Sequence, residues 1–227
     1  MLTLFKFQYA SETCFFIPPK GWEIANPEIL APRVHICFLG KTSKGLAPSI
    51  NLATEPVNVS LESYVEEVRK IHSADPNSRW RDLGKYKTLL GAGRLTELET
   101  PTEGGMARMV QLIVLKEGVA YVLTASAIKE EFSKYYKTFD QVLGSLQSTS
   151  NLIESYPYKK NQLKKLIEEL DQKFINSGSD FNSESFQKES WKPFENKIIN
   201  DFTEMGPYWQ ILLLKELQTS IFIQRSQ

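Results

Sequence analysis

The sequence predicts an α+β fold, with an antiparallel sheet that has helices packed on one face, followed by an all-helical C-terminal extension. In the first two thirds of the 227-residue chain, the spacing of apolar residues alternates between a period of two and a period of 3.6. Turn-forming residues are concentrated there too, since residues 1–150 hold 10 of the 12 glycines and 8 of the 11 prolines. Consecutive strands joined by turns favour a layered α+β arrangement over a repeated β–α–β unit.

A short polar joint, Gln147-Ser-Thr-Ser-Asn151, separates these two compositions. We therefore predict an α+β domain over residues 1–148 and a helical extension of about three helices over residues 152–227.

Six strand-like runs follow one another in the first domain, and the start of the chain forms another run that places Phe5, Phe7 and Tyr9 on one face. The six runs are Cys14–Ile17, Val34–Leu39, Ser49–Thr54, Arg94–Glu99, Met106–Lys116 and Val119–Ala127.

One hairpin has a register that can be predicted residue by residue, because Glu117-Gly118 forms a two-residue loop in which glycine supplies a positive φ. The apolar pairs Val114–Tyr121, Leu112–Leu123 and Val110–Ala125 then share one face. The other face pairs Ile113 with Val122, Gln111 with Thr124, and Met109 with Ser126. We expect the uniformly apolar face to carry both helices of the domain.

Two amphipathic helices are predicted in the first domain. Ser60 is a suitable N-cap for the first helix. The apolar stripe of this helix is Leu61, Tyr64, Val65, Val68 and Ile71. The stripe of the second helix is Phe132, Tyr135, Tyr136, Phe139, Val142, Leu143 and Leu146.

The extension is helical throughout. A first helix carries Leu163, Leu166, Ile167, Leu170 and Phe174, and Pro193 predicts a break near Trp191 in the segment that follows. The last helix opens at Gly206-Pro207 and has apolar residues, including Ile221 and Phe222, on more than one face. Such breadth predicts burial on two sides, inside the extension or at a partner surface.

The sequence shows no complete catalytic, metal or cofactor signature. The two histidines and two cysteines lack ligand spacing, and the glycine-bounded segment 40–45 lacks the lysine, hydroxyl and following helix of a phosphate-binding loop. With 27 basic and 27 acidic residues, the net charge of zero argues against nucleic acid as a partner. We therefore predict no catalytic residue, no metal and no cofactor.

We expect no targeting segment, and no transmembrane span because charged residues interrupt the most apolar late stretch, residues 208–223. We expect a cytoplasmic protein in which Cys14 and Cys37 are reduced and buried.

A series of short motifs resembles the PsbP-like superfamily over about residues 1–148. The motifs are Phe15-Phe-Ile-Pro-Pro-Lys-Gly-Trp22, Pro48-Ser-Ile-Asn-Leu-Ala-Thr-Glu55, Ser60-Leu-Glu-Ser-Tyr64, Arg108-Met-Val-Gln111, Tyr121-Val-Leu-Thr-Ala125 and Leu143-Gly-Ser-Leu146. The layout is similar to the DcrB-like branch, which includes the Eag chaperones of secreted effectors. The resemblance implies a PsbP-like sandwich that acts as a non-catalytic protein-binding scaffold, chaperone-like or an adaptor. It does not extend to the helical tail.

The expected docking surface is the more polar face of the sheet, as the resemblance to the Eag-like branch also implies. Its residues are Asn51, Glu97, Met109, Gln111, Thr124 and Ser126. Three alternatives stay open: the tail covers this face within the chain, the protein is a structural subunit that self-associates through its C-terminal helices, or it is an enzyme with a dispersed active site.

Overall fold

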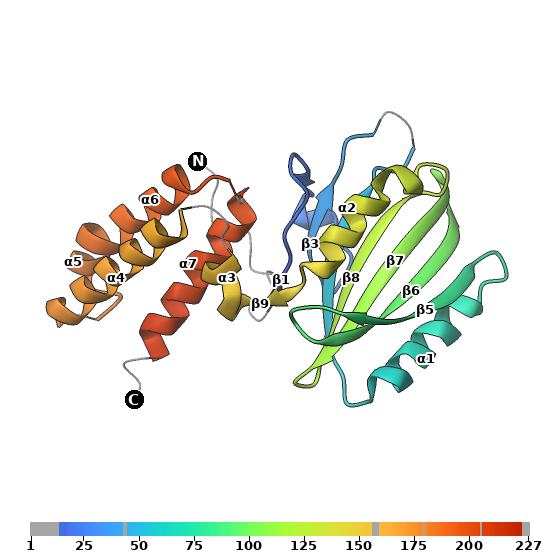
Figure 1. Cartoon of the computed structure of the whole chain (residues 1–227), viewed down its shortest axis with the longest axis horizontal. Coiled ribbons are helices and arrows are strands. Elements are labelled where there is room, and N and C mark those ends of the chain that lie inside the picture. Colours follow the sequence, from blue (N-terminus) through green and yellow to red (C-terminus); the bar gives the residue numbers. More distant parts are fainter. Residues whose placement is uncertain (1–13, 43–44, 156–158, 179, 205, 224–227) are drawn as a thin grey trace. The chain divides into compact units, whose positions relative to one another are not determined.

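The computed structural model describes residues 14–42, 45–155, 159–178, 180–204 and 206–223 (Figure 1). The chain divides into two units, Met1–Gln147 and Ser148–Gln227. The first unit combines a sheet with helices and the second is helical, so the predicted α+β class with a helical extension is confirmed. The predicted first strand, with Phe5, Phe7 and Tyr9, lies outside the described residues.

A seven-stranded antiparallel sheet forms the first unit, with the strand order β2-β3-β4-β8-β7-β6-β5. Its strands are β2 (Glu23–Ile24), β3 (Val34–Leu39), β4 (Ser49–Pro56), β5 (Arg79–Lys87), β6 (Ala92–Thr102), β7 (Gly105–Lys116) and β8 (Val119–Ile128). The first strand, β1 (Cys14–Phe15), pairs with β9 (Gln147–Ser148), where the first unit ends.

The hairpin of β7 and β8 has the predicted register, with Leu112 opposite Leu123 and Gln111 opposite Thr124. Both loop residues adopt a positive φ, 52° at Glu117 and 75° at Gly118, as a type I′ turn requires.

The edge strand β5 is absent from the strands predicted from sequence, because five of its nine residues are charged and its apolar pattern is weak. Charged residues are common on edge strands, where they discourage pairing with other chains. A bulge between Asp82 and Gly84 interrupts its pairing with β6.

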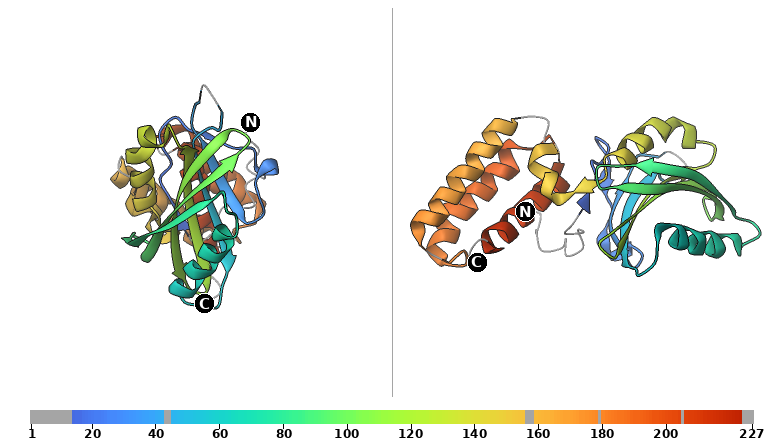
Figure 2. Two further views of the ribbon diagram at one scale, coloured as in Figure 1. Left: turned by 90° about the vertical axis from the view of Figure 1, so that its right-hand side faces the viewer. Right: turned by 60° about the horizontal axis from the view of Figure 1, so that its bottom comes forward.

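The two helices of the first unit lie on opposite faces of the sheet, α1 (Leu61–Ser73) on one and α2 (Phe132–Gly144) on the other (Figure 2). This corrects the expectation that one face carries both. Tyr64 and Val65 of α1 pack with Ile113 and Ala120, which belong to the face expected to be polar. The reason is that the turn end of the β7–β8 hairpin is apolar on both faces, so each face can bury a helix.

We call the two sides of the sheet the α1 face and the α2 face. The α1 face carries Gln111, Ile113, Val122 and Thr124, and the α2 face carries Val110, Leu112, Leu123 and Ala125.

The apolar stripe of α2 is mostly buried, whereas in α1 only Tyr64 and Val65 are buried and Ile71, predicted in the stripe, is 69% exposed. Ser60 caps α1 as predicted, because its Oγ accepts a hydrogen bond from the N–H of Ser63 at 3.1 Å. In α2, Phe132 and Phe139 are buried, whereas Tyr136 is 61% exposed although it belongs to the predicted stripe.

The second unit consists of α3 (Leu152–Ser155), α4 (Lys160–Ser177), α5 (Glu184–Phe186), α6 (Lys192–Asp201) and α7 (Gly206–Ile223). The break predicted near Trp191 is a π-helical turn, Gln187–Trp191, after which Pro193 lies in the first turn of α6. Gln210 of α7 donates from Nε2 to the carbonyls of Ile198 and Phe202 at the end of α6, at 3.0 and 2.8 Å.

Residues 208–214 of α7 are all buried, whereas the side chains of Ile221 and Phe222 lie outside the described set. Among the described helices, none has the length and apolar character needed to cross a bilayer.

Candidate functional site

The α1 face carries a row of polar residues directly opposite one another across four strands. Thr96 of β6 faces Gln111 of β7, which faces Thr124 of β8, which faces Asn51 of β4. Two residues away along the same strands, and therefore on the same face, Met109, Ser126 and Ser49 form a second row. We call these seven residues the polar patch. Five of the six residues predicted as a docking surface, all but Glu97, therefore lie together.

Hydrogen bonds inside the polar patch satisfy only part of its polar atoms. Gln111 Nε2 donates to Thr124 Oγ1 at 3.3 Å, and the hydroxyls of Ser49 and Ser126 lie 2.7 Å apart. Gln111 Oε1 and Thr96 Oγ1 are enclosed and have no hydrogen-bond partner within the described part of the chain. Because an enclosed polar atom without a partner is costly, the patch has unused hydrogen-bonding capacity.

The polar patch contains no ionisable side chain, and the thiol that faces it on β3 is buried. Cys37 of β3 lies opposite Asn51, and burial raises the pKa of its thiol to about 11. The thiol is therefore protonated near neutral pH, and a protonated thiol is a poor nucleophile and metal ligand.

Glu97 lies on the α2 face, not in the polar patch. The pairing of β6 with β7 places it opposite Val110, so its side chain points away from Gln111. Its placement beside the other five predicted residues was therefore wrong. The physical reason is that neighbouring residues of a strand alternate between faces, and Thr96 occupies the position opposite Gln111.

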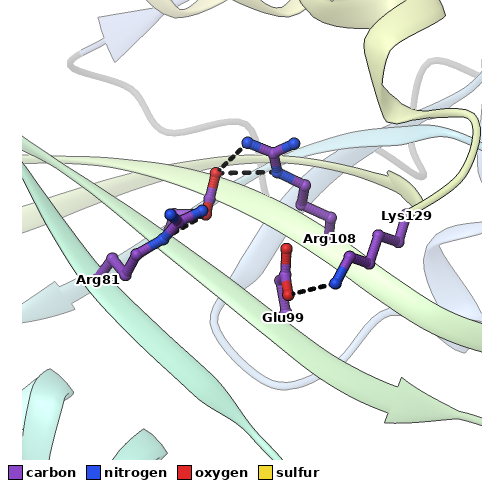
Figure 3. Close-up of polar contacts among 5 residues, drawn as sticks. Arg81, Glu99, Arg108 and Lys129 are labelled. Atoms are coloured by element: carbon purple, nitrogen blue, oxygen red, sulfur yellow. Dashed lines mark hydrogen bonds and ion pairs between the residues drawn. The ribbon is translucent and has the colours of Figure 1, made fainter.

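Two arginines hold the Glu97 carboxylate, which is only 2% exposed (Figure 3). Arg81 of β5 donates to Oε1 from Nε at 2.9 Å and also from Nη2. Arg108 of β7 donates to Oε2 from Nε at 2.9 Å and from Nη2 at 2.5 Å. Each carboxylate oxygen thus receives two charge-assisted hydrogen bonds, which fix both guanidinium groups in place.

A second ion pair lies beside this cluster. Lys129 Nζ donates to Glu99 Oε2 at 2.8 Å, and this hydrogen bond holds the pKa of Glu99 below its usual range (Figure 3). The guanidinium of Arg108 also stacks on the ring of Phe132, 4.7 Å from its centroid, which joins the charged cluster to α2.

A cavity of about 280 Å³ lies between α2 and the strands β5, β6 and β7. Arg81, Glu97 and Arg108 line it together with apolar and aromatic side chains, among them Leu95, Val110, Phe139 and Leu143. We call it the arginine pocket. An apolar cavity with a few convergent polar groups is the usual form of a small-molecule site.

The sequence predictions contained neither the arginine pocket nor its residues in this role. Arg81 belongs to the unpredicted strand β5, and Arg108 entered only as part of a family motif. One local signal was available, because the two-residue turn Glu103-Gly104 fixes the register that pairs Glu97 with Val110.

The described residues hold no group of three or more His, Cys, Asp or Glu side chains that could bind a metal ion.

The fold and these surfaces define a sandwich protein in which an antiparallel sheet carries one helix on each face, with a neutral polar patch on one side and a charged pocket on the other. Solved structures similar to the chain include PsbP (CyanoP) from Synechocystis sp. PCC 6803, with a TM-score of 0.45 and 10% identity over 60% of this chain and 87% of that one. LpqN, involved in cell envelope biogenesis of Mycobacterium tuberculosis, has a TM-score of 0.45 and 12% identity over 60% and 82% of the two chains. A Pseudomonas aeruginosa protein of unknown function has a TM-score of 0.42 and 9% identity over 55% and 94%.

One of these structures is a PsbP, and the sequence motifs above resemble the PsbP-like superfamily. Likenesses this distant concern the fold alone. Neither a protein-family model nor a curated protein sequence matches the chain.

Proposed function

We propose that the chain is a non-catalytic protein-binding module, and that its first unit receives an uncharged segment of a partner protein on the polar patch. The observation that carries the proposal is Gln111 Oε1, an acceptor without a hydrogen-bond partner among the described residues. Gln111 as a whole is half-buried, so a rotation of its side chain would bring this enclosed oxygen to a partner's N–H group.

The chemistry of the polar patch favours a peptide segment as the occupant. Thr96, Thr124 and Ser126 are buried, so the half-buried residues Ser49, Asn51 and Gln111 offer the hydroxyl and amide groups that pair with backbone N–H and C=O groups. The charged residues beside the patch, Asp82 opposite Thr96 and Arg94, neutralise each other in an ion pair, so the patch has no net charge that would attract a phosphate or a lipid headgroup. Met109 adds a flexible apolar contact beside them. Backbone groups and small polar side chains of a neutral segment therefore match the patch best.

Site-specific photo-crosslinking tests this proposal in the full-length protein. A photoreactive residue is placed at Met109 or at Asn51, and a control is placed at Gln141, which is exposed on α2. We expect one identified polypeptide to crosslink from both patch positions and not from Gln141. Crosslinks only to the chain's own tail would refute the proposal and show that the tail covers the patch. Crosslinks only to a second copy would refute it and show self-association.

The paired variant Gln111→Ala/Thr124→Ala then tests the affinity for that polypeptide. It removes both partners of one hydrogen bond, so we expect binding to weaken at least tenfold while the free energy of unfolding changes by less than about 1 kcal/mol. The matched control is Ser133→Ala/Gln141→Ala on the exposed side of α2. Equal affinities of the two paired variants would refute the assignment of the patch.

A further inference from the structure

We propose that the arginine pocket binds a small monocarboxylate with an apolar body, such as an aryl or alkyl carboxylate. This site is separate from the polar patch, since it lies on the other face of the sheet. The inference rests on three properties of the pocket: donors left free at one end, an apolar middle and an acidic residue at the other end.

The free donors belong to Arg81 and Arg108. Each guanidinium has five N–H groups and directs one hydrogen bond from Nε and one from Nη2 to Glu97, which leaves three N–H groups, two on Nη1 and one on Nη2, for another acceptor. Two arginines against one carboxylate also leave one positive charge. Because Glu97 fixes both side chains, an incoming carboxylate meets donors that are already ordered.

The length of the pocket follows α2. Phe132, which stacks on Arg108, and Asp140 both line the cavity, and they lie eight residues apart on the helix. At a rise of about 1.5 Å per residue this separation is roughly 12 Å. Apolar side chains such as Leu95 and Val110 line the pocket too. A ligand with one charged end and an apolar body fits such a lining.

Asp140 determines how many charges the ligand can carry. Its carboxylate accepts a hydrogen bond from the hydroxyl of Tyr86 at 3.1 Å and stays at the exposed end of the pocket. A second carboxylate on the ligand would approach this negative charge, so the pocket selects monoanions over dianions.

Calorimetric titration of the full-length protein with matched probes tests the ligand class. Phenylacetate is compared with 2-phenylethanol, which lacks the charge, and hexanoate is compared with adipate, which carries a second carboxylate. We expect phenylacetate and hexanoate to bind at least tenfold more tightly than their matched analogues. Equal binding of the neutral alcohol, or no binding of either monocarboxylate at millimolar concentration, would overturn the proposal.

Two variants assign the binding to the pocket. Arg108→Gln should weaken phenylacetate binding at least tenfold. The control Arg94→Gln should not, because Arg94 pairs with Asp82 on the α1 face. Equal losses in the two variants would show nonspecific attraction of the anion and contradict the assignment.

A second pair of variants leaves the buried ion pairs intact. Leu83 lines the pocket and is 46% exposed, so it tolerates polar replacements. Leu83→Glu should abolish binding through charge repulsion, whereas the equally long and neutral Leu83→Gln should retain most of it. If both bind alike, the pocket does not recognise the ligand's charge and the proposal fails.

Discussion

The two faces of the sheet differ in whether their enclosed polar atoms have hydrogen-bond partners, and two neighbouring residues of β6 show this difference. Thr96 points to the α1 face, where its hydroxyl has no partner among the described residues. Glu97 points to the α2 face, where four N–H groups from two arginines surround its carboxylate. An unpaired hydroxyl costs about 1–3 kcal/mol, whereas an unpaired buried carboxylate costs several times more. The fold can therefore tolerate a neutral polar atom without a hydrogen-bond partner, but it must neutralise a buried charge itself.

Removing the arginines should give the largest effect. Arg81→Met/Arg108→Met leaves the Glu97 carboxylate buried without a partner, so we expect the free energy of unfolding to fall by about 3–5 kcal/mol. Glu97→Gln should cost less, because the freed side chains of Arg81 and Arg108 are 54% and 32% exposed and can be hydrated. Urea denaturation of both variants measures the difference. A larger loss in Glu97→Gln would contradict the view that the carboxylate is the group that needs neutralising.

The apolar layers of the two faces should differ as well. Leu123 is fully buried on the α2 face, and Leu123→Ala should cost about 2–5 kcal/mol through lost burial and the cavity it leaves. The adjacent residue Val122 points to the α1 face and is half-buried, so Val122→Ala should cost about 1 kcal/mol. Denaturation midpoints with unchanged slopes check both values. Equal losses would mean that α1 covers its face as completely as α2 covers the other.

Local signals account for what the sequence predicted correctly. The β7–β8 hairpin was predictable because a two-residue loop and alternating side chains fix its register within about twenty residues. That register also placed Gln111, Thr124, Met109 and Ser126 on one face. These signals need no knowledge of distant contacts.

Non-local contacts account for what the sequence did not predict. The edge strand β5 lacks an apolar pattern, so Arg81 could not be placed opposite Glu97 before the fold was known. The side on which α1 packs depends on Ile113 and Ala120. Both are apolar residues near the turn of the β7–β8 hairpin, on the same face that carries the polar patch further from the turn. Periodicity alone predicts an apolar surface but not which helix covers it.

A pH titration should give the smallest effect and separates the two faces by their chemistry. The hydrogen bond from Lys129 holds the folded-state pKa of Glu99 below its unfolded value of about 4.3. A depressed folded-state pKa adds stability above the unfolded pKa, and this contribution is lost as the pH falls through the folded-state pKa. Lys129→Met should therefore be less stable than the unsubstituted chain at pH 7, by less than about 1 kcal/mol because Lys129 is 44% exposed, and the difference should shrink as the pH falls below the unfolded-state pKa of Glu99. The control Gln111→Ala changes no titratable group, so its stability difference should stay constant over the same range. Urea denaturation at pH 7, 5, 4 and 3 measures both series, and a constant difference for Lys129→Met would show that the Lys129–Glu99 pair contributes nothing to folding.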